Sequence, residues 1–152
     1  MMTPLEQFIC DSCGEMIEKT EDGWVEWLLA DDRKAHSFRI VHHDQKCQYD
    51  SRRVHVLADD HLTEFLGPDR LANLYRFIDL GQIHDPKGLL SPMARNLKEY
   101  MEIVRRLTIP HYEEARLYWD KAERDGFFEG ANEIWVYLPN NLKALIREYG
   151  ED

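Results

Sequence analysis

The sequence predicts an α+β protein in which a small β-hairpin module at the N-terminus packs with a mainly helical C-terminal body. Two changes along the chain support this prediction. All three cysteines and the clearest β-prone runs fall within residues 1–57, and the apolar residues take up helical spacing from residue 58 onward. Apolar side chains make up 43% of the 152 residues, which is enough for a packed core. We therefore expect a β module over 1–57 and a helical domain over 58–152.

The β module is predicted to contain one hairpin. The run Trp24–Leu29 is rich in the aromatic and apolar residues that strands favour. A polar Asp-Asp-Arg-Lys stretch then provides the tip of the hairpin, and Ser37–His42 is the expected return strand. Because side chains alternate along a strand, His42 would share one face with Phe38 and Ile40.

The C-terminal body is predicted to consist of helices and one short hairpin. Asp59 and Asp60 can cap the first helix, because aspartate side chains accept hydrogen bonds from the free N–H groups at a helix start. Ser91-Pro92 is a strong start signal for a longer helix. The helices are expected at 59–66, 69–80, 91–107, 111–125 and 139–149, and the hairpin near 127–137.

One motif has recognisable chemistry. A Cys-x2-Cys pair is followed, after the predicted hairpin, by two adjacent histidines and a third cysteine. Thiolate and imidazole are preferred ligands of Zn²⁺, which binds four of them in tetrahedral geometry at structural sites. The hairpin would return the chain so that one histidine and the last cysteine complete the site. The expected ligands of one structural zinc ion per chain are Cys10, Cys13, His42 and Cys47, with His43 as the alternative to His42.

The segment FICDSCG, residues 8–14, resembles the first knuckle of the zinc-ribbon and zinc-knuckle proteins. The resemblance covers about the first third of the chain and implies a zinc-stapled, zinc-ribbon-like β module over 1–57. The second knuckle departs from the usual ribbon, because a histidine and a lone cysteine replace a second Cys-x2-Cys pair. Ordinary buried cysteines and a redox pair are the alternatives, although redox Cys-x2-Cys motifs usually begin a helix in a βαβ unit that this sequence lacks.

The helices predicted at 91–107 and 111–125, followed by the hairpin near 127–137, resemble a winged helix. In that arrangement the second helix would contact DNA, and the chain would be a zinc-containing DNA-binding transcriptional regulator. The charges oppose this alternative. Residues 111–125 contain three basic and five acidic side chains, whereas contacts with phosphate groups dominate affinity for DNA.

Composition and charge disfavour further classes of function. The net charge of −10 and the pI near 5.1 argue against general binding to nucleic acids or to anionic membranes. No apolar run approaches the roughly 18 residues of a membrane span, and the first residues lack the basic and apolar regions of a signal peptide. We therefore expect a cytoplasmic protein without membrane contacts.

A second group of candidate residues consists of His55, Asp59, Asp60 and His61, whose carboxylates and imidazoles could serve as acids and bases in an enzyme. Helix capping already explains the two aspartates. The sequence contains no phosphate-binding glycine loop, Gly-x-Ser-x-Gly motif or His-Glu-x2-His motif. The main hypothesis is therefore a non-catalytic, zinc-stabilised binding or regulatory protein whose partner is another protein, and an enzyme using these four residues is the alternative.

Overall fold

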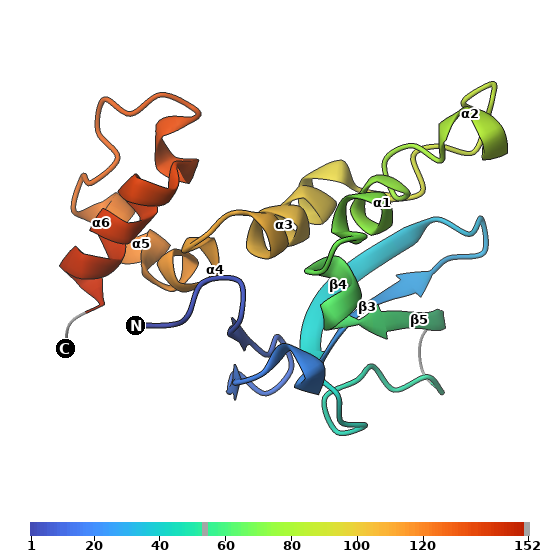
Figure 1. Ribbon diagram of the computed structural model, residues 1–152, viewed down its shortest axis with the longest axis horizontal. Helices are drawn as coiled ribbons and strands as arrows, with labels where there is room; N and C mark the ends of the chain where they lie inside the picture. The colour runs from blue at the N-terminus through green and yellow to red at the C-terminus, as the bar shows by residue number, and fades with distance from the viewer. Residues whose placement is uncertain (53–54, 151–152) are drawn as a thin grey trace.

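The structure, a computed structural model, describes residues 1–52 and 55–150 and has an α+β fold. A three-stranded antiparallel sheet occupies one side of the molecule, and helices lie across it and beyond it (Figure 1). The strand order is β4-β3-β5, with β3 at Gly23–Leu29, β4 at Ala35–His42 and β5 at Val56–His61. The fold class and the hairpin of β3 and β4 predicted from the sequence are therefore confirmed.

The central strand β3 pairs with β4 on one side and with β5 on the other. Val25 of β3 lies opposite Ile40 of β4 in this register. Their side chains are 1% and 0% exposed, respectively. Such a pair of β-branched residues stabilises a sheet through cross-strand packing. The alternation seen in the sequence thus places the apolar face of the hairpin in the core.

The prediction of a short helix over residues 59–66 is wrong. Residues Val56–His61 form β5, which pairs with β3 along its whole length. This pairing satisfies the backbone of the segment and outweighs the weak local preference of its two aspartates for a helix start. One 3-10 turn, η2 at Leu62–Phe65, follows the strand and buries both of its terminal residues.

Gly23 begins β3 where a side chain has no room. A Cβ atom at this position would lie 2.6 Å from Leu62 Cδ2 and 3.2 Å from Leu62 Cβ. Leu62 is itself fully buried and has little freedom to move. We expect Gly23→Ala to lower the free energy of unfolding by about 1–3 kcal/mol through overpacking. Urea denaturation measures this loss, and an unchanged midpoint with an unchanged slope would contradict it.

The remaining elements are short apart from two helices. β1 at Phe8–Ile9 and β2 at Met16–Ile17 form a separate two-stranded ribbon. The other helical segments are η1 (Thr20–Asp22), α1 (Arg70–Tyr75), α2 (Gly81–His84), α3 (Leu97–Thr108), α4 (Tyr112–Ala115), η3 (Arg116–Tyr118), α5 (Trp119–Arg124), η4 (Trp135–Tyr137) and α6 (Pro139–Tyr149).

The long helix predicted over residues 91–107 begins later than its Ser-Pro signal indicates. α3 starts at Leu97, because the side chain of Asn96 accepts a hydrogen bond of 3.2 Å from the N–H of the third helical residue. Ser91 lies in the irregular segment before the helix, where its backbone N–H donates to the carboxylate of Asp85 at 2.8 Å. The Ser-Pro position is therefore not the start of a helix.

The hairpin predicted near 127–137 does not form. The segment consists of turns and η4. Gly126 adopts a positive φ of 79°, and the side chain of Asn132 accepts a hydrogen bond of 2.9 Å from the N–H of Trp135. The helix predicted over 111–125 is broken into α4, η3 and α5, whereas α6 confirms the last predicted helix. The described residues therefore lack the wing of a winged helix.

The core consists of two hydrophobic clusters. The first joins the sheet to η2, α1 and α3, and it includes residues from both sides of position 57, such as Ile40 and Leu107. The second includes Tyr112 and Leu142 and lies within the C-terminal unit, by which we mean residues 112–149. α3 runs between the sheet and this unit (Figure 1). No helix among the described residues is long and apolar enough to cross a membrane.

Candidate metal centre

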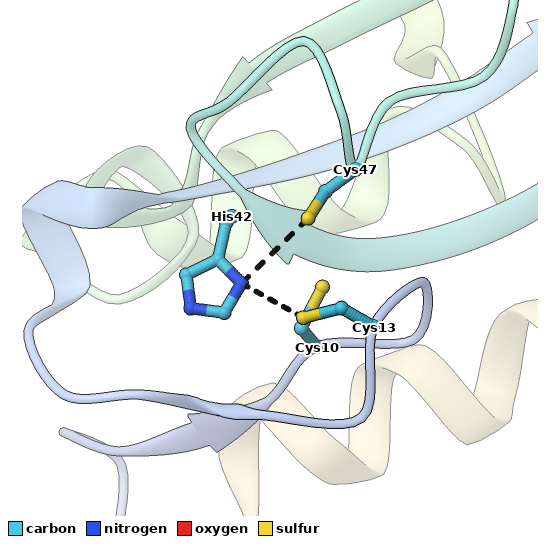
Figure 2. Close-up of side chains that lie close together, drawn as sticks. All are labelled: Cys10, Cys13, His42 and Cys47. Carbon is cyan, nitrogen blue, oxygen red and sulfur yellow. Dashed lines mark hydrogen bonds between the residues drawn. The ribbon is translucent and has the colours of Figure 1, made fainter.

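The four side chains predicted as zinc ligands meet in one small group, which we call the metal cluster. The sulfur atoms of Cys10, Cys13 and Cys47 and one ring nitrogen of His42 all lie within 4.8 Å of one another. Figure 2 shows the four side chains gathered around a common centre. Within residues 1–52 and 55–150, no other group of histidine, cysteine, aspartate and glutamate side chains has comparable metal-ligand spacing.

The turn between β1 and β2 presents the first two sulfur atoms. The N–H of Cys10 donates to Glu15 O, and the N–H of Gly14 donates to Cys10 O, both at 2.9 Å. Gly14 has a φ of 78°, a left-handed conformation that glycine adopts without strain. The turn buries Cys10, which is 1% exposed, and leaves Cys13 at the surface.

His42 ends β4 with its ring oriented for metal binding. Its Nε2 lies 3.2 Å from Met16 O, and because a carbonyl oxygen only accepts hydrogen bonds, Nε2 must carry the proton. The free lone pair is therefore on Nδ1, which lies 3.4 Å from Cys13 Sγ and 3.9 Å from Cys47 Sγ. A backbone partner that fixes the tautomer in this way is typical of metal-binding histidines.

The neighbouring His43 points away from the metal cluster. His43 is the first residue after the end of β4, and its side chain is not among the four that meet in the cluster. The ring of His43 packs 3.9 Å from the ring of Trp24 and 5.7 Å from that of His61, measured between centroids. The structure thus brings His42, the first of the two alternatives, to the cluster.

A loop after β4 returns Cys47 to the cluster, and a buried ion pair holds this loop. The carbonyl of Cys47 accepts a hydrogen bond of 3.0 Å from Arg39 Nη2. Arg39 Nε donates to Glu26 Oε1 at 2.9 Å, and Glu26 is 0% exposed. The Arg39 guanidinium also lies 3.6 Å from the centre of the Tyr49 ring. Charge-assisted contacts with the sheet therefore position the last ligand.

The pKa values of the Cys10 and Cys47 thiols are shifted in opposite directions. Burial raises the pKa of the Cys10 thiol, but hydrogen bonds from the backbone of Cys13, His42 and Ser12 outweigh burial and lower this pKa to about 6. Burial and the two neighbouring thiols raise the pKa of Cys47 to about 12. Like charges this close disfavour one another, so a cation at the centre would be needed to keep all three sulfurs ionised.

The donor set and its spacing fit a zinc ion. In a tetrahedral site with Zn–S bonds of about 2.3 Å, the sulfur atoms are about 3.8 Å apart. The separations in the metal cluster, all within 4.8 Å, require only a small contraction to reach this geometry. Three thiolates and one imidazole form a closed set of four ligands, which leaves no open position for a reacting water. The cluster is therefore compatible with a structural metal ion.

The second candidate group, His55, Asp59, Asp60 and His61, does not form a joint site. Alternation along β5 turns the two aspartates to opposite faces, and each of the four side chains has a different neighbour. These neighbours are His36 for His55 (3.1 Å between ring nitrogens), Gln48 for Asp59 (3.0 Å), Arg76 for Asp60 (3.5 Å) and His43 for His61 (5.7 Å between ring centroids).

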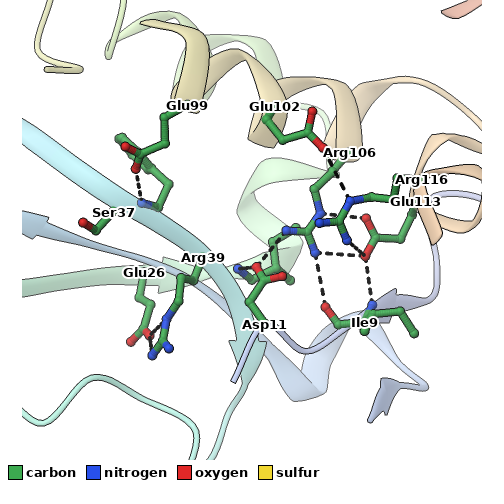
Figure 3. A network of polar contacts seen from close by, with 12 residues as sticks. Ile9, Asp11, Glu26, Ser37, Arg39, Glu99, Glu102, Arg106, Glu113 and Arg116 are labelled. Atoms are coloured by element: carbon green, nitrogen blue, oxygen red, sulfur yellow. Dashed lines mark hydrogen bonds and ion pairs between the residues drawn. The ribbon is translucent and has the colours of Figure 1, made fainter. Parts of the chain in front are cut away.

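The sequence does not predict a polar network that lies beside the metal cluster (Figure 3). Arg106 of α3 is 2% exposed, and its Nη1 lies 2.7 Å from the carboxylate of Asp11, in the turn between the first two cysteines. Its Nε and Nη2 donate to the two carboxylate oxygens of Glu113 at 2.7 and 2.9 Å. No local spacing could indicate this contact, because Asp11 and Arg106 are 95 positions apart.

Comparison with known proteins reveals no relative of this chain. No protein-family model, no curated protein sequence and no solved structure matches it. The closeness of the three cysteines and His42 is therefore compatible with a metal site but is supported by no recognised family.

Proposed function

We propose that this chain is a non-catalytic binding or regulatory protein that holds one structural zinc ion on the metal cluster. The observation that carries the proposal is the convergence of three thiols and one imidazole nitrogen within 4.8 Å. The orientation of His42 supports it, because the unprotonated nitrogen faces the sulfurs. The three cysteines form no disulfide, which suits a reducing compartment such as the cytoplasm.

The zinc ion would stabilise the fold instead of taking part in a reaction. β1 and β2 are two residues long, and a two-stranded ribbon of this size has little stability of its own. Zinc would tie the turn of this ribbon to the end of β4 and to the loop that follows. Because such a site does not exist in the unfolded chain, the free energy of metal binding becomes free energy of folding.

Another protein is the partner that the chemistry of the surface favours. A net charge of −10 opposes binding to nucleic acids. Large apolar side chains are exposed around α2, where Ile83 and Leu89 are 87% and 79% exposed. A contiguous exposed apolar surface is typical of a protein interaction site, and we propose that these side chains belong to one. The proposed binding or regulatory role is therefore directed at a protein partner.

Removal of the metal tests the structural role. We expect a chelator to strip zinc from the protein and to lower the melting temperature by about 10 °C, since several kcal/mol are lost and each corresponds to about 2–4 °C at this size. One equivalent of Zn²⁺ should restore the original melting curve. Acidification should release the ion as well, because protons compete for thiolate and imidazole. An unchanged melting curve after verified metal removal would contradict the proposal.

A further inference from the structure

We propose that Asp11 and Arg106 transmit metal occupancy to the C-terminal unit, so that zinc orders residues 112–149 as well as the turn that it contacts. This inference rests on the proposed zinc site and goes beyond local stabilisation. The C-terminal unit has its own hydrophobic cluster, separate from the cluster that contains Cys10 and Cys47. Polar contacts between the two hydrophobic clusters therefore provide a route by which a change at the metal-binding turn can affect the C-terminal unit.

Asp11 connects the metal-binding turn to both β4 and α3. Its N–H donates to Ile40 O at 2.8 Å, and its Oδ2 accepts a hydrogen bond of 2.7 Å from the N–H of Ile40. The same oxygen lies 2.7 Å from Arg106 Nη1. Because Asp11 stands between two ligands, Cys10 and Cys13, a metal ion on those sulfurs fixes the position of this carboxylate.

Arg106 depends on that carboxylate because it is buried. The side chain of Arg106 is 2% exposed, and that of Glu113, its other partner, is 6% exposed. If Asp11 moves away, Arg106 keeps its ion pair with Glu113, but Nη1 loses its hydrogen-bond partner, and an unpaired donor on a buried charged group is costly. Its Nη2 also donates to Ile9 O at 3.2 Å, and Glu113 Oε1 accepts from the N–H of Ile9 at 2.9 Å. Arg106 and Glu113 thus join β1, α3 and α4 at one point (Figure 3).

α4 carries the effect into the C-terminal unit. Glu113 is flanked by Tyr112 and lies two residues before Ala115, and both of these neighbours belong to the second hydrophobic cluster. Glu114 adds a further link, because its Oε2 accepts a hydrogen bond of 2.7 Å from the N–H of Met2. If the metal leaves and the turn loosens, α4 loses polar contacts on the side facing β1 while its apolar side stays in the second cluster. The C-terminal unit is then less firmly attached and opens more often.

Amide hydrogen exchange on the full chain tests this coupling. In the wild type, zinc should slow exchange in α4 and α6 by about fivefold or more, the lower end of typical coupling between sites. Asp11→Asn keeps an oxygen for the N–H of Ile40 but replaces the charged contact with Arg106 Nη1 by a weaker neutral one. With one zinc bound, this variant should retain protection of the turn between β1 and β2 and should exchange in α4 and α6 at the faster, metal-free rate. Asp31→Asn, at an exposed aspartate in the tip of the hairpin, should behave as the wild type.

The reciprocal measurement is zinc affinity. Coupling between two sites acts equally in both directions, so Glu113→Gln should weaken zinc binding by a factor similar to the protection lost in α4. Glu123→Gln, at an exposed glutamate of α5, is the matched control and should leave the affinity unchanged. If Glu113→Gln fails to fold, the comparison of zinc-loaded wild type with zinc-loaded Asp11→Asn decides the question.

The outcomes separate this inference from the proposed function. Zinc binding by the wild type with protection confined to the N-terminal strands would overturn the coupling and leave the zinc site standing. Equal exchange in α4 for zinc-loaded wild type and zinc-loaded Asp11→Asn would overturn it as well. A wild-type protein that binds no zinc would overturn both proposals.

Discussion

Cys47→Ser is expected to abolish stoichiometric zinc binding and to unfold the N-terminal β region before the helices. A serine hydroxyl is a poor zinc ligand, and structural zinc sites contribute about 10–16 kcal/mol of apparent binding free energy in small zinc-finger peptides. A loss of several kcal/mol from such a contribution is a large fraction of the roughly 5–15 kcal/mol by which most domains are stable. Zinc content after dialysis measures the binding, and amide exchange shows which strands open first.

A pair of histidine variants provides the matched control for this prediction. His42→Asn should lose zinc as Cys47→Ser does, because it removes the nitrogen that faces the sulfurs. His43→Asn should retain zinc, since that ring packs against Trp24 instead. Full zinc content and an unchanged melting curve in Cys47→Ser would show that the ligands have been assigned incorrectly.

Arg39→Met is expected to lower the free energy of unfolding by about 3–5 kcal/mol, the usual effect of removing one partner from a buried ion pair. Methionine preserves much of the packing of the arginine stem but leaves Glu26, which is 0% exposed, without its cation. It also removes the hydrogen bond to Cys47 O, so zinc should dissociate more readily. Urea denaturation of the zinc-loaded protein measures the stability, and chelator competition measures the affinity.

Two comparisons isolate the contribution of the buried charge. Arg52→Met breaks a pair with Asp50 in which Arg52 is 87% exposed, and it should cost less than about 1 kcal/mol. The double variant Glu26→Leu with Arg39→Met should recover much of the stability lost in the single variant, because two apolar residues no longer leave a charge unpaired. A loss in Arg39→Met no larger than that in Arg52→Met would contradict the role assigned to the pair.

The sequence predicts the elements whose pattern is local. Alternation identifies β3 and β4, and helical spacing identifies α6. β5 escapes prediction because its two aspartates suggest a helix start, whereas its strand conformation comes from pairing with β3. The Ser-Pro signal likewise falls in an irregular segment held by Asp85, and α3 starts at Leu97, with Asn96 as its N-cap. Tertiary contacts determine the conformation of these segments, and such contacts cannot be inferred from the local sequence.

The candidate metal site, too, is predictable only where its pattern is local in the sequence. The four donors are predictable because their residue types, and their positions before and after one predicted hairpin, already imply their convergence. The structure then separates the two histidines, because only His42, the last residue of β4, reaches the sulfur atoms. The contact of Asp11 with Arg106 is not predictable in this way, because it joins residues 95 positions apart whose types are common on any surface.

The central claim is that the metal cluster binds one zinc ion, and the most direct measurement is native mass spectrometry of untagged protein purified without chelator. The account predicts one zinc ion per chain, bound at neutral pH and released on acidification. A metal-free protein with three freely titrating thiols would contradict it.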